Sequence, residues 1–386
     1  MEFYGYRRPD GRVGVRNKVL ILPASVCASD TTRIIAQQVT GSVTFNNQQG
    51  CAQVAPDQQL TMDVMAGYAA NPNIYGTVVV SLGCENCQMD LVVDAIRQRT
   101  NKPLKQVIIQ ESGGTLKAID KAVRYAKEMV EEASLLQKEK FPISELILGT
   151  ECGGSDPTSG LAANVLIGQL SDLLVQAGAT SILSETTEFI GAEHILARRA
   201  ATPEVRDRIF EIVHRYEKAL QMVGEEVRKG NPSPGNKAGG ITTLEEKSLG
   251  CIHKGGHSPV MEVYDYAKQV EAKKGLVIMD TPGHDPSSVA AMVAGGAQVV
   301  VFSSGRGTPT GNPIAPVIKI TGNRITYANM IDNIDVDASP LIYGGDLKEM
   351  GDELLKLLVE VASGKQTKAE SLGYTEMAIA RACNYV

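Results

Sequence analysis

Short apolar runs alternate with amphipathic segments along most of this chain. The runs are rich in Val, Ile and Leu without regular polar alternation, and they occupy residues 18–26, 77–82, 106–110, 145–148, 276–279, 298–302 and 317–320. Helical periodicity marks segments between and after them, at 116–133, 161–176, 203–227, 287–294 and 347–361. Strands that are apolar on both faces are typical of parallel sheets covered by helices. The pattern therefore predicts an α/β protein with mostly parallel sheets.

The length of 386 residues exceeds one ordinary domain of about 100–200 residues. Pro, Gly, Asn and Lys concentrate in 225–240, which indicates a linker, and a charged stretch at 131–140 marks a second boundary. We expect two to three Rossmann-like subdomains: an N-terminal α/β domain (1–138), a middle α/β domain ending in the linker (139–240) and a C-terminal α/β domain (241–386).

Charge and composition narrow the classes of partner. The net charge of −6, with Lys and Arg dispersed, argues against a nucleic-acid partner. No run approaches the ~18 apolar residues of a membrane span, so no membrane partner is expected. The chain has seven cysteines, an odd number, and its first residues do not resemble a secretory signal. Both features favour a cytoplasmic location. With no Trp for stacking, a small polar ligand is favoured.

Four cysteines follow apolar runs in glycine-bearing turns, at Cys51, Cys84, Cys152 and Cys251. Such turns give a thiol access and hydrogen-bond donors, whereas a structural cysteine is normally buried among apolar residues. Cys84 and Cys87 form the single C-x-x-C pair of the sequence. A structural zinc site built from two C-x-x-C pairs is therefore not supported. A redox pair stays open, beside the simpler reading in which Cys87 packs in a helix.

The turn ECGGSD places Gly153, Gly154, Ser155 and Asp156 between a strand and a helix. Accessible backbone N–H groups and the helix start suit a carboxylate or phosphate, so these four residues are candidate substrate ligands. The plainer alternative makes Asp156 only a helix N-cap.

A second loop, SSGRGTPTGN, follows the strand predicted at 298–302. Arg306 is the expected anchor for a substrate carboxylate, and Gly307, Thr308 and Asn312 are expected to line the same site. A dinucleotide fingerprint does not fit, because the loop has an additional residue and contains a proline. A nicotinamide-dependent dehydrogenase is thereby disfavoured.

Two further segments concentrate titratable groups. In EKSLGCIHKGGH, Lys254 or His257 is a candidate general base, against the alternative of exposed histidines. In ETTEFIGAEH, Glu188 and His194 are candidate catalytic residues, as metal ligands or as an acid/base pair. Solvated charges at a helix start would also explain that second cluster.

Taken in order, RPDGRVGVRN, LGCE, IQESGGT, ECGGSDPTSG, ETTEFIGAEH, EKSLGCIHKGG and SSGRGTPTGNPIAPVIKITGN resemble the altronate/galactarate dehydratase family over almost the whole chain. That family includes the large subunit of (2R)-sulfolactate sulfo-lyase. The resemblance implies a lyase that removes a group β to a carboxylate, water from a sugar acid or sulfite from sulfolactate, with Fe²⁺ or a similar metal. A noncatalytic iron–sulfur scaffold subunit is the alternative from another class.

Removal of a proton α to a carboxylate needs a Lewis acid, a cation and an acid for the leaving group. Cys51, Cys84 and Cys152 match family motif positions, and we infer them as metal ligands, since thiolates favour iron over magnesium. Mn²⁺ or an iron–sulfur cluster is the alternative cofactor.

Two departures from the family pattern bear on partners and substrate. Many members carry a small SAF-like domain or subunit ahead of this region. We therefore expect a SAF-like small subunit as a partner, and we expect the chain to form a homo-oligomer. Asn47 stands where the family pattern has a histidine. A histidine ligand or base at this position is therefore in doubt, and the identity of the hydroxy acid stays open.

Overall fold

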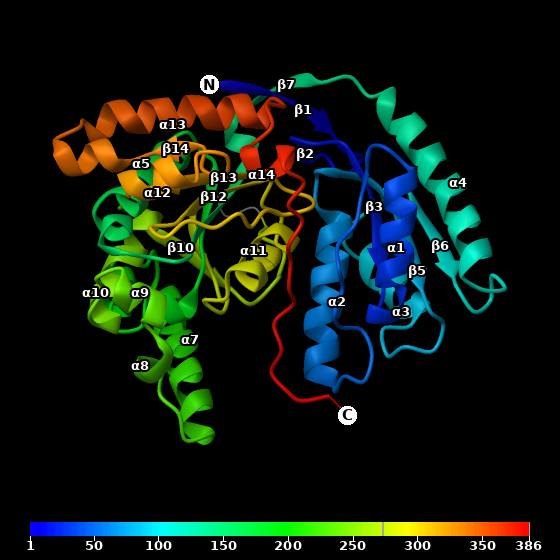
Figure 1. Cartoon of the computed structure of the whole chain (residues 1–386), viewed down its shortest axis with the longest axis horizontal. Helices are drawn as coiled ribbons and strands as arrows, with labels where there is room; N and C mark the ends of the chain where they lie inside the picture. The colour runs from blue at the N-terminus through cyan, green and yellow to red at the C-terminus, as the bar shows by residue number, and fades with distance from the viewer. Residues whose placement is uncertain (272–273, 386) are drawn as a thin grey trace.

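The structure is a computed structural model that describes residues 1–271 and 274–385. Two parallel sheets lie side by side, each covered by helices (Figure 1). The smaller sheet consists, in spatial order, of β4 (Ser42–Val43), β3 (Lys18–Pro23), β5 (Ile74–Ser81) and β6 (Leu104–Ile108). Its helices are α1 (Val26–Gln38), α2 (Ala55–Ala70), α3 (Met89–Arg97) and α4 (Thr115–Ser134). Apolar residues of β3 and β5 pack against α1 and α4 on one face and α2 and α3 on the other, which explains their unbroken apolar pattern.

The larger sheet has seven strands, and all its pairs are parallel. In spatial order they are β10 (Val260–Tyr264), β11 (Gly275–Met279), β9 (Thr180–Leu183), β8 (Ile147–Cys152), β12 (Val299–Ser303), β13 (Val317–Thr321) and β14 (Val336–Asp337). The longer helices that cover it are α5 (Asn164–Gln176), α7 (Pro203–Met222), α11 (Asp285–Ala294) and α13 (Leu347–Ala362). Shorter ones are α6 (Glu193–Ala197), α8 (Val227–Gly230), α9 (Pro234–Ala238), α10 (Leu244–Ile252), α12 (Arg324–Asn329) and α14 (Lys368–Ser371).

An antiparallel ribbon joins the two units near the start of the chain. Its strands are β2 (Val13–Gly14), β1 (Glu2–Arg7) and β7 (Glu139–Pro142). Phe3 of β1 is fully buried in the core that α5 and α13 form with the larger sheet. The first residues of the chain therefore contribute to the larger unit, although the smaller sheet follows them directly in sequence.

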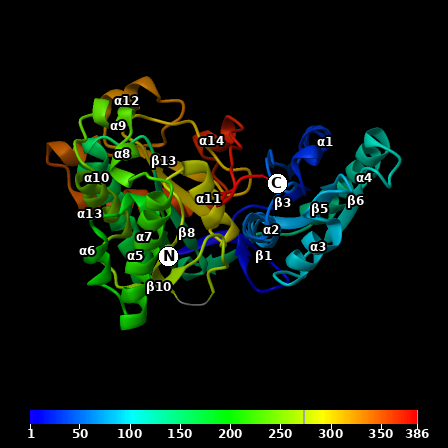
Figure 2. The same cartoon turned by 90° about the horizontal axis from the view of Figure 1, so that it is seen from below.

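Helices α2 and α11 form the main contact between the two units, and Figure 2 shows the smaller unit beside the larger one. Buried residues of both helices belong to one continuous core. The approach is close because residue 67 is glycine: a Cβ there would overlap the Ala294 backbone and side chain. The two units are thus in close contact at this helix pair.

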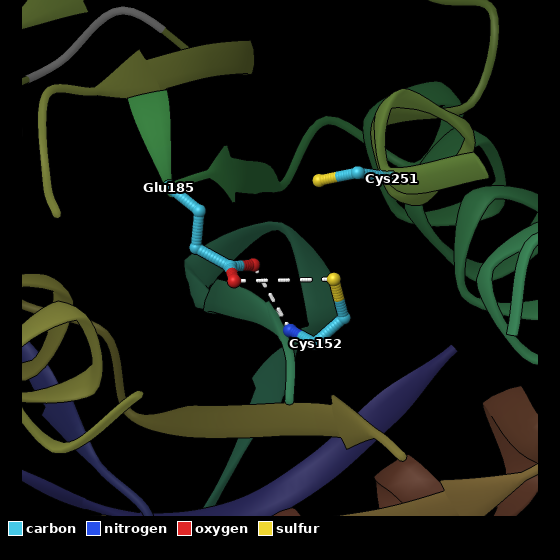
Figure 3. Close-up of side chains that lie close together, drawn as sticks. All are labelled: Cys152, Glu185 and Cys251. Atoms are coloured by element: carbon cyan, nitrogen blue, oxygen red, sulfur yellow. Dashed lines mark hydrogen bonds between the residues drawn. The ribbon is translucent and has the colours of Figure 1, made fainter. Parts of the chain in front are cut away.

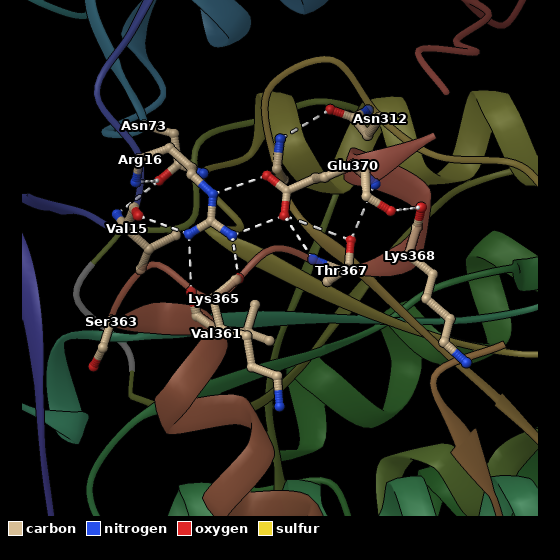
Figure 4. Close-up of polar contacts among 12 residues, drawn as sticks. Val15, Arg16, Asn73, Asn312, Val361, Ser363, Lys365, Thr367, Lys368 and Glu370 are labelled. Carbon is tan, nitrogen blue, oxygen red and sulfur yellow. Dashed lines mark hydrogen bonds and ion pairs between the residues drawn. The ribbon is translucent and has the colours of Figure 1, made fainter. Parts of the chain in front are cut away.

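A buried ion pair fastens the smaller unit to the C-terminal helices. The Arg16 guanidinium donates through Nε and Nη2 to the two Glu370 carboxylate oxygens, at 2.8 Å each, and both side chains are about nine-tenths buried (Figure 4). The remaining N–H groups of Arg16 donate to the carbonyls of Val15, Val361 and Lys365. Full pairing of a buried guanidinium offsets its desolvation, so this contact fixes the relative position of the two units.

The predicted α/β class with mostly parallel sheets is confirmed. The domain boundaries stay predictions, but strands from both sides of residue 240 pair in one sheet, so this position does not separate two sheets. The Pro/Gly-rich segment 225–240 contains the short helices α8 and α9, and its buried Asn236 donates to the Ser155 carbonyl at 2.9 Å. No described helix is long and apolar enough to cross a membrane.

We expect Gly67→Ala to lower the free energy of unfolding by about 1–3 kcal/mol, because the added methyl forces α2 and α11 apart. Chemical denaturation measures the change. Gly230→Ala in α8 is the matched control, since a Cβ there meets nothing within 4 Å and its effect should stay below about 1 kcal/mol. Equal stability of the two variants would show that the interface tolerates a wider separation.

Candidate active site

Charged and sulfur-bearing side chains gather where three neighbouring strands of the larger sheet end. Glu151 and Cys152 close β8, Glu185 comes two residues after β9, and Thr281 comes two residues after β11. Lys254 reaches the same place from the turn that follows α10. Ligands of open parallel sheets bind outside the carboxyl ends of strands, and this convergence marks the candidate active site.

Lys254 is the cation at the centre of this group, and its side chain has no exposed surface. Its Nζ donates to Cys152 Sγ at 2.9 Å, to Cys251 Sγ at 3.2 Å and to the Glu185 carboxylate. Figure 3 shows Cys152, Cys251 and Glu185 facing one another around this position. Burial alone would lower the pKa of an ammonium, but the surrounding thiols and carboxylates hold the pKa of Lys254 well above its usual value. Lys254 is therefore protonated at neutral pH.

Cys152 is a neutral thiol in this setting. Its hydrogen bond with Cys251 and its burial raise its pKa well above the usual value. Nucleophilic chemistry needs the thiolate. Cys152 thus serves here as a hydrogen-bonding partner of Lys254 and Glu185.

Glu185 adopts an unusual backbone conformation, with φ of 69° and ψ of 65°. Its own N–H donates to Thr281 Oγ1 at 2.7 Å, and its carboxylate accepts the Cys152 N–H at 2.9 Å. A non-glycine residue in the left-handed region costs about 1–3 kcal/mol and persists where surrounding contacts impose it, commonly at functional sites. The strain directs the Glu185 carboxylate inward between β8 and α10.

Carboxylate oxygens of Glu151, Glu185 and Asp285 lie within 4.8 Å of one another. Ser288 and Ser184 donate to Glu151 Oε2, at 2.6 and 3.1 Å, while the buried Glu151 Oε1 has no hydrogen-bond partner among the described residues. Burial and the neighbouring Glu185 raise the pKa of Glu151 well above its usual value. Three converging carboxylates, one of which has an unpaired oxygen, fit the ligand set of a hard divalent cation.

Asp285 enters this group because of the glycine at position 153. A Cβ on Gly153 would overlap the Asp285 carboxylate. Asp285 is the first residue of α11, and burial followed by the repulsion of Glu185 raises its pKa to about 7. What approaches Gly153 here is a protein carboxylate, and its role as a substrate ligand stays a prediction.

Glu188 forms a second ion pair beside the cluster. Lys247 Nζ lies 2.8 Å from Glu188 Oε2, and both side chains are largely buried. Burial raises the pKa of Glu188 even though Lys247 opposes this effect. A raised pKa favours the protonated form of a carboxyl, as a general acid requires.

A cavity of about 270 Å³ opens between the start of α5 and α10. Its walls include Ser155 and Asp156 from the turn after β8, and Lys247 and His253 from the other side. Gly250 of its wall is the sequence neighbour of Cys251. A volume of this size accommodates a small hydroxy acid.

The Arg306 loop and the Gly153–Asp156 turn, both predicted as substrate-binding, lie against each other. The Arg306 N–H donates to the Gly154 carbonyl at 2.8 Å, and the Arg306 side chain is exposed. Gly307 and Thr308 are half-buried in the same loop. Asp156 accepts hydrogen bonds from Thr158 and Ser159 at the following helical turn, as the N-cap alternative foresaw.

Other predicted site residues lie elsewhere. Cys51 and Cys84 are on loops of the smaller unit, and neither joins Cys152 in a candidate ligand group among the described residues. His257 is exposed and hydrogen-bonds Asp172 at 3.1 Å, and His194 is exposed on α6. Asn312 is buried, and its side chain binds Tyr68 and the N–H groups of Ile314 and Ala315. The Asn47 side chain likewise binds the backbone, because it donates to the Pro23 carbonyl.

Asp285 and Lys247 were missed from the sequence. Asp285 lies between the strand predicted at 276–279 and the helix predicted at 287–294, so the strand-end argument used for Cys152 applies to it as well. Lys247 carries no comparable signal, because a lysine among glutamates on a helix is normally solvated.

Two family descriptions match the chain. "D-galactarate/Altronate dehydratase, C-terminal" covers residues 143–384, and "D-galactarate dehydratase/Altronate hydrolase, second domain" covers residues 5–134. The chain belongs to the D-galactarate/altronate dehydratase family. The candidate active site lies in the part matched by the first description, and the resemblance stated from the motifs is confirmed.

Relatives in this family include dehydratases and a sulfo-lyase. The chain is 37% identical to altronate dehydratase of Bacillus subtilis (strain 168), over 98% of the chain and 77% of that protein. It is 37% identical to (2R)-sulfolactate sulfo-lyase subunit beta of Chromohalobacter salexigens, over 98% of the chain and 97% of that protein. Galactarate dehydratase (L-threo-forming) of Escherichia coli (strain K12) is 34% identical, over 94% of the chain and 73% of that protein. The expected lyase class is thereby confirmed.

The raised pKa of Asp285 predicts a pH-dependent stability of the metal-free protein. The folded chain retains this proton up to about pH 7, whereas the unfolded chain loses it near pH 4, so the Asp285 contribution to stability is lost as pH rises through this window. The free energy of unfolding of Asp285→Asn, relative to that of the unmodified chain, should therefore rise by up to about 4 kcal/mol between about pH 4 and pH 7. Denaturation with a chelator present measures this difference, with the exposed Asp352→Asn as control. A difference independent of pH would contradict the assigned environment of Asp285.

Proposed function

We propose that the chain is a metal-dependent lyase that eliminates water from a small sugar acid such as altronate or galactarate, by removal of the proton α to the carboxylate. The observation that carries the proposal is the group of three carboxylates, with an unpaired oxygen on Glu151, next to a buried ammonium at the strand ends. Relatives that are 34–37% identical over nearly the whole chain and are named altronate or galactarate dehydratase support the reaction class.

Glu151, Glu185 and Asp285 are the residues we propose to hold the metal. Their oxygens suit Fe²⁺ or Mn²⁺, and such an ion would supply Lewis-acid stabilisation of the negative charge that develops when the α proton leaves. Cys152, Cys251 and Glu185 form another possible ligand group, but the Lys254 ammonium already binds all three. An iron–sulfur cluster on Cys51, Cys84 and Cys152 is correspondingly less favoured.

Lys254 and Glu188 have distinct proposed roles. Because Lys254 is protonated, it acts as a fixed positive charge that stabilises the developing enediolate, and the general base predicted at this position is disfavoured. Glu188, whose pKa burial raises, is the residue that we propose to protonate the leaving hydroxyl. Lys247 keeps that carboxyl in place.

The substrate carboxylate is proposed to bind at the junction of the two glycine-rich turns. The Arg306 side chain is available there, because it is exposed and its backbone is fixed to Gly154. The neighbouring cavity would hold the remaining hydroxylated carbons. A guanidinium that can bind both carboxylate oxygens explains how the reacting carbon is oriented.

Carbon–sulfur cleavage of sulfolactate is the second candidate, favoured by one observation. The chain is 37% identical to (2R)-sulfolactate sulfo-lyase subunit beta over 98% of the chain. Lys247 and His253 line the cavity and could face a sulfonate, which needs more positive charge than a hydroxyl does. Because that relative is named a subunit, we also propose that this chain works with a separate small subunit.

We expect Glu151→Gln to weaken binding of Fe²⁺ or Mn²⁺ by roughly 100-fold and to abolish turnover, since it removes a charged ligand atom. Anaerobic calorimetric titration measures the affinity directly. Glu353→Gln, at an exposed position of α13, is the control and should bind metal as the unmodified chain does. Full affinity in Glu151→Gln combined with loss in Cys51→Ser or Cys84→Ser would move the metal site to the smaller unit.

The reaction itself is tested anaerobically with the metal-loaded chain, alone and with a candidate small subunit. Release of a 2-keto acid from altronate or galactarate is the expected result. Sulfite release from sulfolactate would assign carbon–sulfur cleavage instead. Bound metal without turnover of any of the three acids would contradict both activities and favour a noncatalytic subunit.

A further inference from the structure

Lys319 is a second fully buried lysine of the larger sheet, and none of the roles above uses it. It lies on β13, in register with Phe302 of β12, and Phe302 is in register with Glu151 of β8. Residues in register on neighbouring parallel strands point to the same face of the sheet. Lys319 is therefore in the same row as the proposed metal ligand Glu151, two strands away.

The Lys319 ammonium lies under the loop that carries Arg306. Its Nζ is 5.1 Å from the centre of the Phe302 ring and donates to the Thr310 carbonyl, and no other acceptor for it is found in the described part of the chain. Burial lowers the pKa of Lys319 to about 8, against the attraction of Asp335, Glu376 and Asp285, so it is charged at neutral pH. Its charge is thus directed at one backbone carbonyl of this loop.

The C-terminal segment and α2 hold the other parts of the same loop. Glu376 accepts the Gly311 N–H at 3.2 Å, and Asn312 donates to Tyr68 of α2 at 2.9 Å. A Cβ on Gly311 would clash with the Tyr374 backbone, so the segment passes close over the loop. Lys319 supplies a charged hydrogen bond to this loop at Thr310, four residues from Arg306 in sequence.

We propose that Lys319 is a positioning residue that fixes the loop 305–312 beside the Gly153–Gly154 turn and thereby sets the affinity for the substrate carboxylate. The inference rests on the proposed function, in which Arg306 of this loop binds that carboxylate. A glycine-rich loop that loses a charge-assisted hydrogen bond becomes more mobile. Substrate binding must then order the loop, and the loss of conformational entropy weakens binding. Such a loss raises KM and leaves kcat largely unchanged.

Lys319→Met tests the proposal, and Lys319→Gln is the second variant, which retains a hydrogen-bond donor should the apolar side chain prevent folding. Lys102→Met is the matched control: Lys102 is also fully buried and donates to two backbone carbonyls, of Asn71 and Ile74, but in the smaller unit. We expect KM for the accepted acid to rise roughly tenfold in Lys319→Met, less in Lys319→Gln and not in Lys102→Met. The affinity for Mn²⁺ alone should be unchanged in all three.

Amide hydrogen exchange without substrate separates this proposal from the proposed function. Exchange in residues 305–312 should be faster in the Lys319 variants than in the unmodified chain and in Lys102→Met. That result supports the positioning role even if no sugar acid is turned over, which would refute only the proposed function. Unchanged exchange and KM, or a loss of Mn²⁺ affinity together with kcat, would overturn the proposal.

Discussion

The candidate active site depends on one buried positive charge. Glu151, Glu185 and Asp285 converge at the strand ends, and like charges at such distances, removed from water, raise one another's pKa and favour protonation. The Lys254 ammonium binds Glu185 and acts on Glu151, so part of this negative charge is compensated before any ligand binds. Carboxyls poised in this way can exchange protons for a cation near neutral pH.

The arrangement of the two units is part of the site, because Asp285 is the first residue of the helix that packs against the smaller unit. Helix α11 presents Asp285 to the cluster at its N-terminus and meets Gly67 of α2 near its C-terminus. The neighbouring Ser288 of the same helix donates to Glu151. A shift of the smaller unit relative to the larger sheet would therefore move two of the groups that define the cluster.

The strands that could be predicted from sequence are those buried on both faces, since their apolar runs are uninterrupted. Helix α2 escaped prediction for the opposite reason: Asp57, Thr61 and Asp63 are buried along with its apolar residues, so it has no polar face to reveal the period. The four-residue β9 is too short to show a pattern. Local residue patterns thus indicate where strands end, while the buried polar residues of α2 hide its helical period.

The same limit explains what was missed in the site. The strand-end argument led to Cys152 and its neighbours and, together with the density of titratable groups, to Lys254. Cys51 and Cys84 were added as ligands because they match family motif positions. The order of strands within a sheet and the division into two sheets are not encoded in local spacing, so the sequence did not separate them from Cys152. Chemically, the consequence is large: thiols on two sheets suggest a sulfur-ligated iron, whereas the strand ends of one sheet bring together carboxylates, for which a harder divalent ion is the natural partner.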